Sequence, residues 1–111
     1  MPVISKIINP TFGRRLRQAR LRMNLPQDRL GVLAGLDEAS SSARISRYEG
    51  AVHEPSVKFA KELAKVLGVP VAFLYCDDDR LAEIILTYSS MSELQRGELL
   101  SLISRSNQLY Q

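Results

Sequence analysis

Residues 25–35 read Leu-Pro-Gln-Asp-Arg-Leu-Gly-Val-Leu-Ala-Gly, and this stretch decides the fold. It predicts a short helix, because Pro26 is tolerated in a first helical turn and Gly35 readily adopts the left-handed conformation that ends a helix. Gly31, in the middle, allows another helix to approach closely. Residues 43–49 read Ala-Arg-Ile-Ser-Arg-Tyr-Glu, and they predict a second helix with one apolar face and one face of serine and arginine.

Length and composition limit the class of protein. The chain has 111 residues, of which 45% are hydrophobic and 24% charged, so it can bury the core of one domain with a small appendage. No apolar run approaches the ~18 residues that span a bilayer, and no signal peptide is evident. A single cysteine, Cys76, excludes an internal disulfide and fits a reducing cytoplasm. We therefore expect no membrane segment.

Helical periodicity recurs along the whole chain and no strand pattern appears, so the prediction is an all-α fold. Thr11 is the expected N-cap of the first helix, and either Asp37 or Ser40 that of the third. Ser92 with Gln95 forms a capping box. The expected helices cover residues 12–23, 27–34, 42–49 with an earlier start left open, 56–67, a short segment after Pro70, 80–88 and 93–106.

Apolar positions at helical spacing predict which side chains form the core. In the second and third helices these are Leu30, Leu33, Ala34, Ile45 and Tyr48, and in the fourth they are Val57, Ala60, Leu63, Ala64 and Leu67.

Charge is unevenly distributed along the chain. Residues 1–50 carry nine lysines and arginines against four acidic residues, whereas residues 51–111 carry six against eight. A basic surface is expected where a protein faces phosphates, although a solvated basic face would look the same. Two short helices joined by a tight turn, the second basic on its exposed side, are how a helix-turn-helix presents itself to DNA. The coincidence of both features favours a DNA-binding module.

Residues 12–76 resemble the Cro/repressor-type helix-turn-helix family, also called XRE-like. The resemblance implies a compact bundle of five helices whose third helix enters the major groove, here followed by two extra C-terminal helices. The domains expected on this basis are an N-terminal arm over residues 1–11, the helix-turn-helix domain over 12–76 and a helical extension over 77–111. The matching residues, in order, are Arg20, Leu25, Gln27, Leu30, Gly31, Gly35, residues 45–49, Pro55, Leu63, Ala64, Leu67, Gly68, Val69, Phe73 and Leu74.

The same resemblance implies roles for individual residues. Gln27 matches a position that hydrogen-bonds a phosphate, and Arg20 and Glu49 match an ion pair that ties the first helix to the end of the third. Arg47 is the best candidate for reading a base, because an arginine can bind guanine O6 and N7 bidentately, whereas Arg44 could equally contact a phosphate. The candidate DNA contacts on the helix around residues 40–49 are Ser41, Ser42, Ala43, Arg44, Ser46 and Arg47.

Two departures from the family pattern concern this helix. About four residues more than in the compact phage repressors separate Gly35 from Ile45, which is close to one helical turn. The helix therefore starts earlier, or the turn before it is larger. After Glu49 the chain has Gly50-Ala51, where the family places glycine one residue later. We expect the loop to shift by one residue, because a positive φ at Ala51 would be strained.

The sequence gives little support for a metal site or for catalysis. His53 and Cys76 are the only residues of their types, so no zinc site and no catalytic nucleophile–base set can be assembled. Residues 77–79 are three aspartates without the further ligands of a calcium loop, and they suit the start of a helix. We expect no enzymatic activity, no metal and no cofactor.

The C-terminal helices carry broad apolar faces that include Ile84 and Leu102. They either pack on the bundle or form a dimer interface, and the apolar arm around Ile4 and Ile8 is another place for one. The sequence thus predicts a cytoplasmic transcriptional regulator, a repressor, and the resemblance implies that it is bacterial or phage-encoded. It would bind a double-stranded operator as a homodimer. The alternative is a helical protein-interaction module, or an antitoxin-like partner protein, without independent DNA reading.

Overall fold

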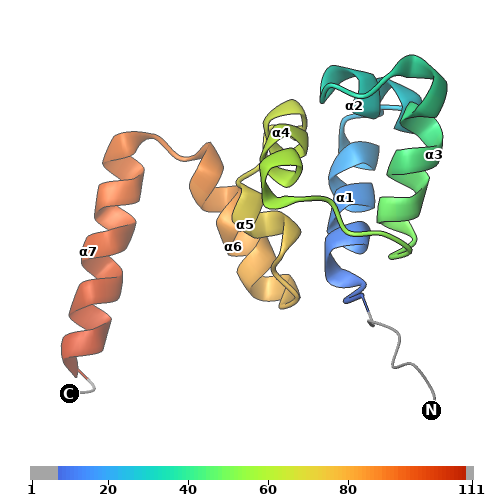
Figure 1. Cartoon of the computed structure of the whole chain (residues 1–111). Helices are drawn as coiled ribbons and strands as arrows, with labels where there is room; N and C mark the ends of the chain where they lie inside the picture. The colour runs from blue at the N-terminus through green and yellow to red at the C-terminus, as the bar shows by residue number, and fades with distance from the viewer. Residues whose placement is uncertain (1–7, 110–111) are drawn as a thin grey trace, which may run out of the picture.

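The computed structural model describes residues 8–109, which form seven helices and no strand. They are α1 (Thr11–Arg22), α2 (Gln27–Leu33), α3 (Glu38–Glu49), α4 (Val57–Leu67), α5 (Val71–Leu74), α6 (Asp79–Ser90) and α7 (Glu93–Leu109) (Figure 1). The predicted all-α class is confirmed. Within residues 8–109 no helix is both long and apolar enough to cross a bilayer. The N-terminal arm is the other predicted place for a dimer interface, and its residues 1–7, Ile4 included, lie outside the described part of the chain.

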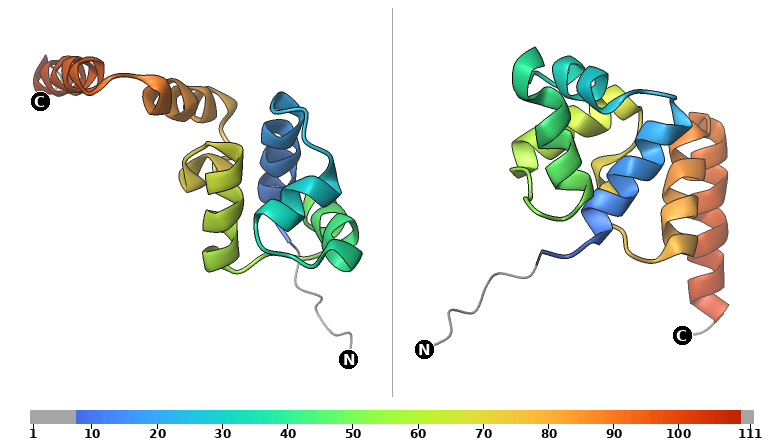
Figure 2. Two further views of the ribbon diagram at one scale, coloured as in Figure 1. Left: turned by 90° about the horizontal axis from the view of Figure 1, so that it is seen from above. Right: turned by 90° about the vertical axis from the view of Figure 1, so that its right-hand side faces the viewer.

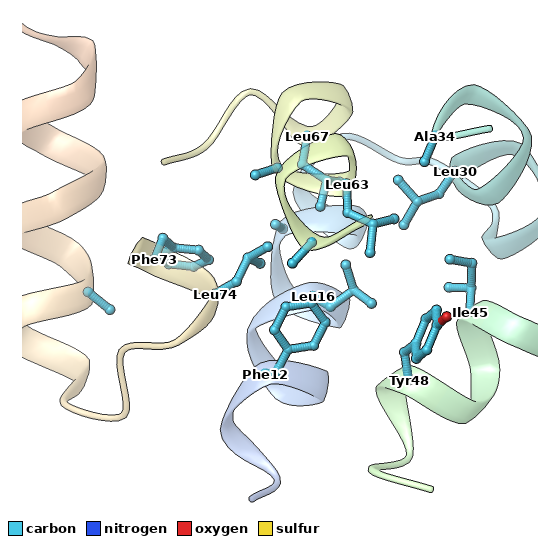
Figure 3. Packing of buried hydrophobic residues seen from close by; sticks show 14 residues of the cluster. Phe12, Leu16, Leu30, Ala34, Ile45, Tyr48, Leu63, Leu67, Phe73 and Leu74 are labelled. Atoms are coloured by element: carbon cyan, nitrogen blue, oxygen red, sulfur yellow. The ribbon is translucent and has the colours of Figure 1, made fainter. Parts of the chain in front are cut away.

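The core lies between α1, α2, α3, α4 and α5 (Figure 3). Leu16 of α1, Leu30 of α2 and Ile45 of α3 are completely buried there, as are Leu63 of α4 and Phe73 of α5. Each helix contributes one apolar stripe, so the five helices enclose a single core, as expected for a bundle of this size.

Two residues predicted for this core are exposed instead. Leu33 is 49% exposed, because α2 reaches the core through Leu30 and Ala34, one turn apart, and Leu33 lies beside that line. Val57 is 61% exposed, because it is the first residue of α4 and lies a turn ahead of Ala60, where the core begins. Both positions follow the helical period, but neither faces a neighbouring element.

The start of α1 also differs from the prediction. Thr11 is not the N-cap but the first residue of the helix, and Pro10 precedes it. The Oδ1 atom of Asn9 accepts a hydrogen bond from the Thr11 N–H at 2.9 Å, which satisfies one of the unpaired donors of the first turn. A proline side chain carries no hydrogen-bond acceptor, so the residue before Pro10 supplies the cap.

The third helix starts earlier than its firmly predicted part, at Glu38, with Asp37 as N-cap in extended conformation. Of the two candidates for the N-cap, Ser40 therefore lies inside the helix. The additional residues after Gly35 lengthen α3 at its N-terminus rather than enlarging the turn. Gly35 itself has a φ of +110°, and the Leu36 N–H bonds to the Gly31 carbonyl at 2.9 Å, so α2 ends in a left-handed cap.

The end of α3 repeats this cap with an alanine in the glycine position. The Val52 N–H donates to the Arg47 carbonyl at 2.9 Å, and the Ala51 N–H donates to the Tyr48 carbonyl at 3.2 Å. This pair of bonds requires a left-handed residue at Ala51, whose φ is +57°, whereas Gly50 has a φ of −85°. The expected shift of the loop is therefore wrong, because the carbonyls of the last turn of α3 fix the loop's register.

The C-terminal helices behave differently from each other. The inner side of α6 packs against α5 and the core through Ala82, Ile85 and Leu86. The capping box predicted for α7 is present: the Ser92 N–H bonds to Gln95 Oε1 at 3.0 Å and the Gln95 N–H to Ser92 Oγ at 3.2 Å. From this start α7 runs apart from the bundle (Figure 2). Of the two predicted roles, packing on the bundle applies only to the inner side of α6.

Candidate nucleic-acid interface

Helix α3 has one buried face and one exposed face. Ser41, Ile45 and Tyr48 are buried, at the spacing of one helical stripe. Helix α2 packs against this side more closely than against any other helix (Figure 1). The other predicted contacts on α3 are all exposed: Ser42, Ala43, Arg44, Ser46 and Arg47.

Ser41 must be removed from the predicted contacts. Its side chain is completely buried, and its hydroxyl donates to the Asp28 carbonyl at 2.6 Å. It lies one turn before Ile45, and because α3 starts early that turn is helical and continues the buried stripe. A small polar side chain fits there because α2 presents Gly31 at the same place, so the two helices approach closely.

Arg20 and Glu49 lie together where α1 meets the end of α3. Arg20 Nε donates to Glu49 Oε2 at 2.6 Å and Nη2 donates to Oε1 at 3.0 Å, so the pair is bidentate. Both side chains are nearly buried, 11% and 5% exposed. The hydrogen bond to Glu49 raises the pKa of Arg20 above its ordinary value, although burial acts in the opposite direction. This pair holds the last turn of α3 against α1.

The same carboxylate also orients Gln27, the first residue of α2. Gln27 Nε2 donates to Glu49 Oε1 at 3.2 Å, and the side chain is half-buried. Arg20 Nη1 donates in addition to the Leu25 carbonyl at 2.9 Å, just before α2 begins. One cluster therefore joins α1, the start of α2 and the end of α3. An amide nitrogen carries two N–H donors, so the bond to Glu49 uses only one of those of Gln27.

The two arginines on the exposed face differ in their contacts. Arg44 Nη2 donates to the Tyr48 hydroxyl at 3.0 Å, with the guanidinium 6.0 Å from the centre of that ring. Arg47 is exposed, and within the described part of the chain its guanidinium has no hydrogen bond or ion pair. Arg44 is thus held against its own helix, whereas Arg47 keeps all its donors for a ligand.

The basic side chains of residues 1–50 are not all exposed, and some of them form contacts within the fold. Arg15 is 2% exposed, and it donates to the Cys76 carbonyl at 2.7 Å and to Asp79 at 2.9 Å, so it joins α1 to α6. Arg14 also binds Asp79, at 3.1 Å. Sequence reasoning missed this cluster, because nothing local to Arg15 indicates a carboxylate 64 residues later. Arg29, by contrast, is exposed on α2.

Comparisons with known proteins bear on the region just described. A family model described as a helix-turn-helix domain matches residues 11–73. The crystal structure of the transcriptional regulator BswR is similar with a TM-score of 0.81 and 45% sequence identity. That similarity covers 84% of this chain and 92% of the other, so it extends over more of the chain than residues 11–73. A comparison with curated proteins finds no significant match.

Proposed function

This chain belongs to the helix-turn-helix domain family, and we propose that it is a transcriptional regulator that reads double-stranded DNA with the exposed face of α3. The observation that carries the proposal is the arrangement of α3. One face is locked to the bundle by Ile45, Tyr48 and the Arg20–Glu49 pair, while the opposite face offers short polar side chains and Arg47. A rigid helix with unpaired donors suits the major groove. The similarity to a protein named as a transcriptional regulator supports the same function.

The proposed contacts divide by chemistry. Arg47 reads a base, because its donors are unpaired and a guanidinium fits the O6 and N7 edge of guanine. Ser42 and Ser46 bond to base edges or phosphates, and the Ala43 methyl group suits contact with a thymine methyl group. Gln27 and Arg44 bind phosphates and fix the position of the helix without reading sequence. The Arg20–Glu49 pair orients α3 and touches no DNA.

We propose further that the protein acts as a repressor and binds as a homodimer. One bundle reads only a few base pairs, so two copies on half-sites about 34–36 Å apart are needed for a specific operator. A protein seated on such an operator blocks access to it without needing another surface, which favours repression. Contact with an operator also places the protein in the cytoplasm, bacterial or phage-encoded as the family resemblance implies.

A second candidate function is a protein-interaction module, or an antitoxin-like partner, that does not read DNA by itself. Exposed leucines on α7, among them Leu94 and Leu100, favour this candidate, because apolar side chains of this size are typical of protein interfaces. The two candidate functions differ in whether they require the exposed face of α3: only DNA binding needs Arg47.

Selection of bound duplexes from a random DNA pool tests the proposal. We expect one family of sequences to be enriched, with two related half-sites. Arg47→Ala should then cost roughly 1–3 kcal/mol and relax the preference at one position in each half-site. Gln27→Ala should weaken all sequences alike. Lys65→Ala, which removes an exposed basic side chain on α4, is the matched control without effect on preference. A pool without enrichment would contradict DNA reading and favour the interaction module.

A further inference from the structure

A cavity of about 520 Å³ opens between α1, α5 and α6. Helices α1 and α6 both pack on α5 but make no extensive contact with each other, which leaves this space between them. Its apolar lining consists of Phe73, Ala82 and Leu86. The cavity lies apart from the exposed face of α3, because α3 and α6 lie on opposite sides of α1 (Figures 1 and 2). Its volume is that of a typical small-molecule site.

The α1 wall of the cavity carries two arginines with unused hydrogen-bond donors. Arg15 is 2% exposed, and three of its five N–H groups are bound. One donates to the Cys76 carbonyl, one to Gln18 Oε1 at 3.1 Å and one to Asp79 Oδ1 at 2.9 Å, which leaves two. Arg14 uses one N–H group, to the same Asp79 oxygen at 3.1 Å, which leaves four. This wall therefore suits a carboxylate, which binds guanidinium groups strongly.

The α6 wall carries two carboxylates with unused acceptors. Asp79 and Glu83 are four residues apart, so they lie on the same side of α6. Both arginines bind Asp79 through Oδ1, so Oδ2 accepts no hydrogen bond from any described residue. The Glu83 side chain is exposed, and within residues 8–109 its carboxylate has no hydrogen bond or ion pair. This wall therefore suits an ammonium group, which has three N–H donors.

We propose that this cavity binds a zwitterionic small molecule, an α-amino acid with an apolar side chain. The two positive charges of α1 and the two negative charges of α6 balance each other, so a ligand with a single charge gains little there. An amino acid presents its carboxylate to the two arginines and its ammonium group to Asp79 Oδ2 and Glu83. Its side chain covers the apolar lining, where removal of apolar surface from water stabilises the complex.

Isothermal titration calorimetry of the full chain without DNA tests this site independently of DNA reading. The probes are L-leucine, L-methionine and L-phenylalanine, and we expect saturable binding of at least one at millimolar concentration or below. Isocaproate is leucine without its ammonium group, and isoamylamine is leucine without its carboxylate. Each should bind at least about tenfold more weakly than leucine, because one set of charge-assisted hydrogen bonds is lost. No binding of any amino acid, or equal binding of either analogue, would overturn the proposal.

Charge reversal at Glu83 tests where the ligand lies. Glu83→Lys replaces an acceptor by a cation on an exposed position, so the fold should persist, as circular dichroism can check. Leucine should bind this variant about tenfold more weakly, whereas isocaproate should bind it more tightly than it binds the parent. The matched control is Glu62→Lys on α4, outside the cavity, which should leave both affinities unchanged. Equal affinities for the parent and Glu83→Lys would show that the ligand binds elsewhere.

Removal of one guanidinium group tests the opposite wall. Arg14→Met should weaken leucine binding about tenfold, and Arg15 still holds Asp79 in this variant, so α6 stays attached to α1. The matched control is Arg17→Met, an exposed arginine of α1 that does not line the cavity. If Arg14→Met and Arg17→Met bind leucine as the parent does, the carboxylate does not lie against the α1 wall and the assignment is wrong.

Discussion

Gly31 of α2 lies so close to Ser41 of α3 that a methyl group on Gly31 would overlap the Ser41 hydroxyl. That hydroxyl is already committed, since it donates to the Asp28 carbonyl at 2.6 Å. The two residues thus set how closely α2 and α3 pack. Because the exposed face of α3 is the opposite side of the same helix, this contact also sets how that face is presented relative to α2.

Gly31→Ala should destabilise the protein by about 1–3 kcal/mol, since the added methyl group must push α3 away from α2. Urea unfolding followed by circular dichroism measures this. Ser41→Gly, introduced into the Gly31→Ala protein, removes the overlapping atoms and should restore part of the loss. If Gly31→Ala is as stable as the parent, or if Ser41→Gly only adds a further loss, the close contact does not control the packing.

Glu49→Gln should cost about 3 kcal/mol of unfolding free energy, because it leaves the buried Arg20 charge without its carboxylate. Arg20→Met in the Glu49→Gln protein removes that uncompensated charge, so the double variant should lose less than the two single variants added together. A thermodynamic cycle in urea gives the coupling. Strict additivity would show that the pair does not hold α3.

Ala51→Gly should stabilise the protein by about 1 kcal/mol, since a φ of +57° strains an alanine and not a glycine. Its matched control is Ala39→Gly, an exposed position inside α3, where glycine should lose about 1 kcal/mol. Thermal unfolding of both variants decides the point. A loss of stability at Ala51 similar to that at Ala39 would mean that the left-handed cap is absent in solution.

The attachment of α6 to α1 should depend on pH. Hydrogen bonds from Arg14 and from Arg15 hold the pKa of Asp79 below its ordinary value. A carboxyl group with a depressed folded pKa stabilises the protein at pH values above its unfolded pKa, and this stability is lost as the pH falls through the folded pKa. Asp79→Asn should therefore be less stable than the parent near neutral pH, with the difference shrinking in acid.

Urea unfolding from about pH 7 to about pH 2 checks this dependence. Asp77→Asn is the control, since Asp77 binds neither arginine, and it should follow the parent curve. A difference between Asp79→Asn and the parent that stays constant down to the lowest pH would contradict the ionic role of Asp79.

Local patterns were enough to predict the helices and most of the core. Leu30, Ile45 and Leu63 follow the helical period, and the capping box of Ser92 and Gln95 is a local signal. Burial of Leu33 and Val57 was predicted wrongly, because the period shows which side of a helix a residue occupies but not where the neighbouring helix ends. The left-handed conformation of Ala51 follows from carbonyls of the preceding turn, against the preference of the residue itself.

The candidate site was predictable in a similar way. Ser42, Ala43, Arg44, Ser46 and Arg47 are exposed on α3 as the resemblance implies. Ser41 was wrongly predicted to contact DNA. Ser41 lies on the buried side of α3 because the helix already starts at Glu38, and no single residue in the sequence marks that start. The role of Arg15 depends on the Cys76 carbonyl and on the Asp79 carboxylate, both distant in the chain, and these contacts leave no trace in the sequence.

The most direct test of the central claim, that the basic helix-turn-helix surface binds DNA, is the affinity for the selected duplex as a function of salt concentration. Each phosphate contact releases condensed counterions, so the logarithm of the association constant should fall linearly with the logarithm of salt, with a slope of about −0.9 for each phosphate neutralised. Gln27→Ala should weaken binding at every salt concentration. A flat dependence, or no binding at low salt, would contradict the account.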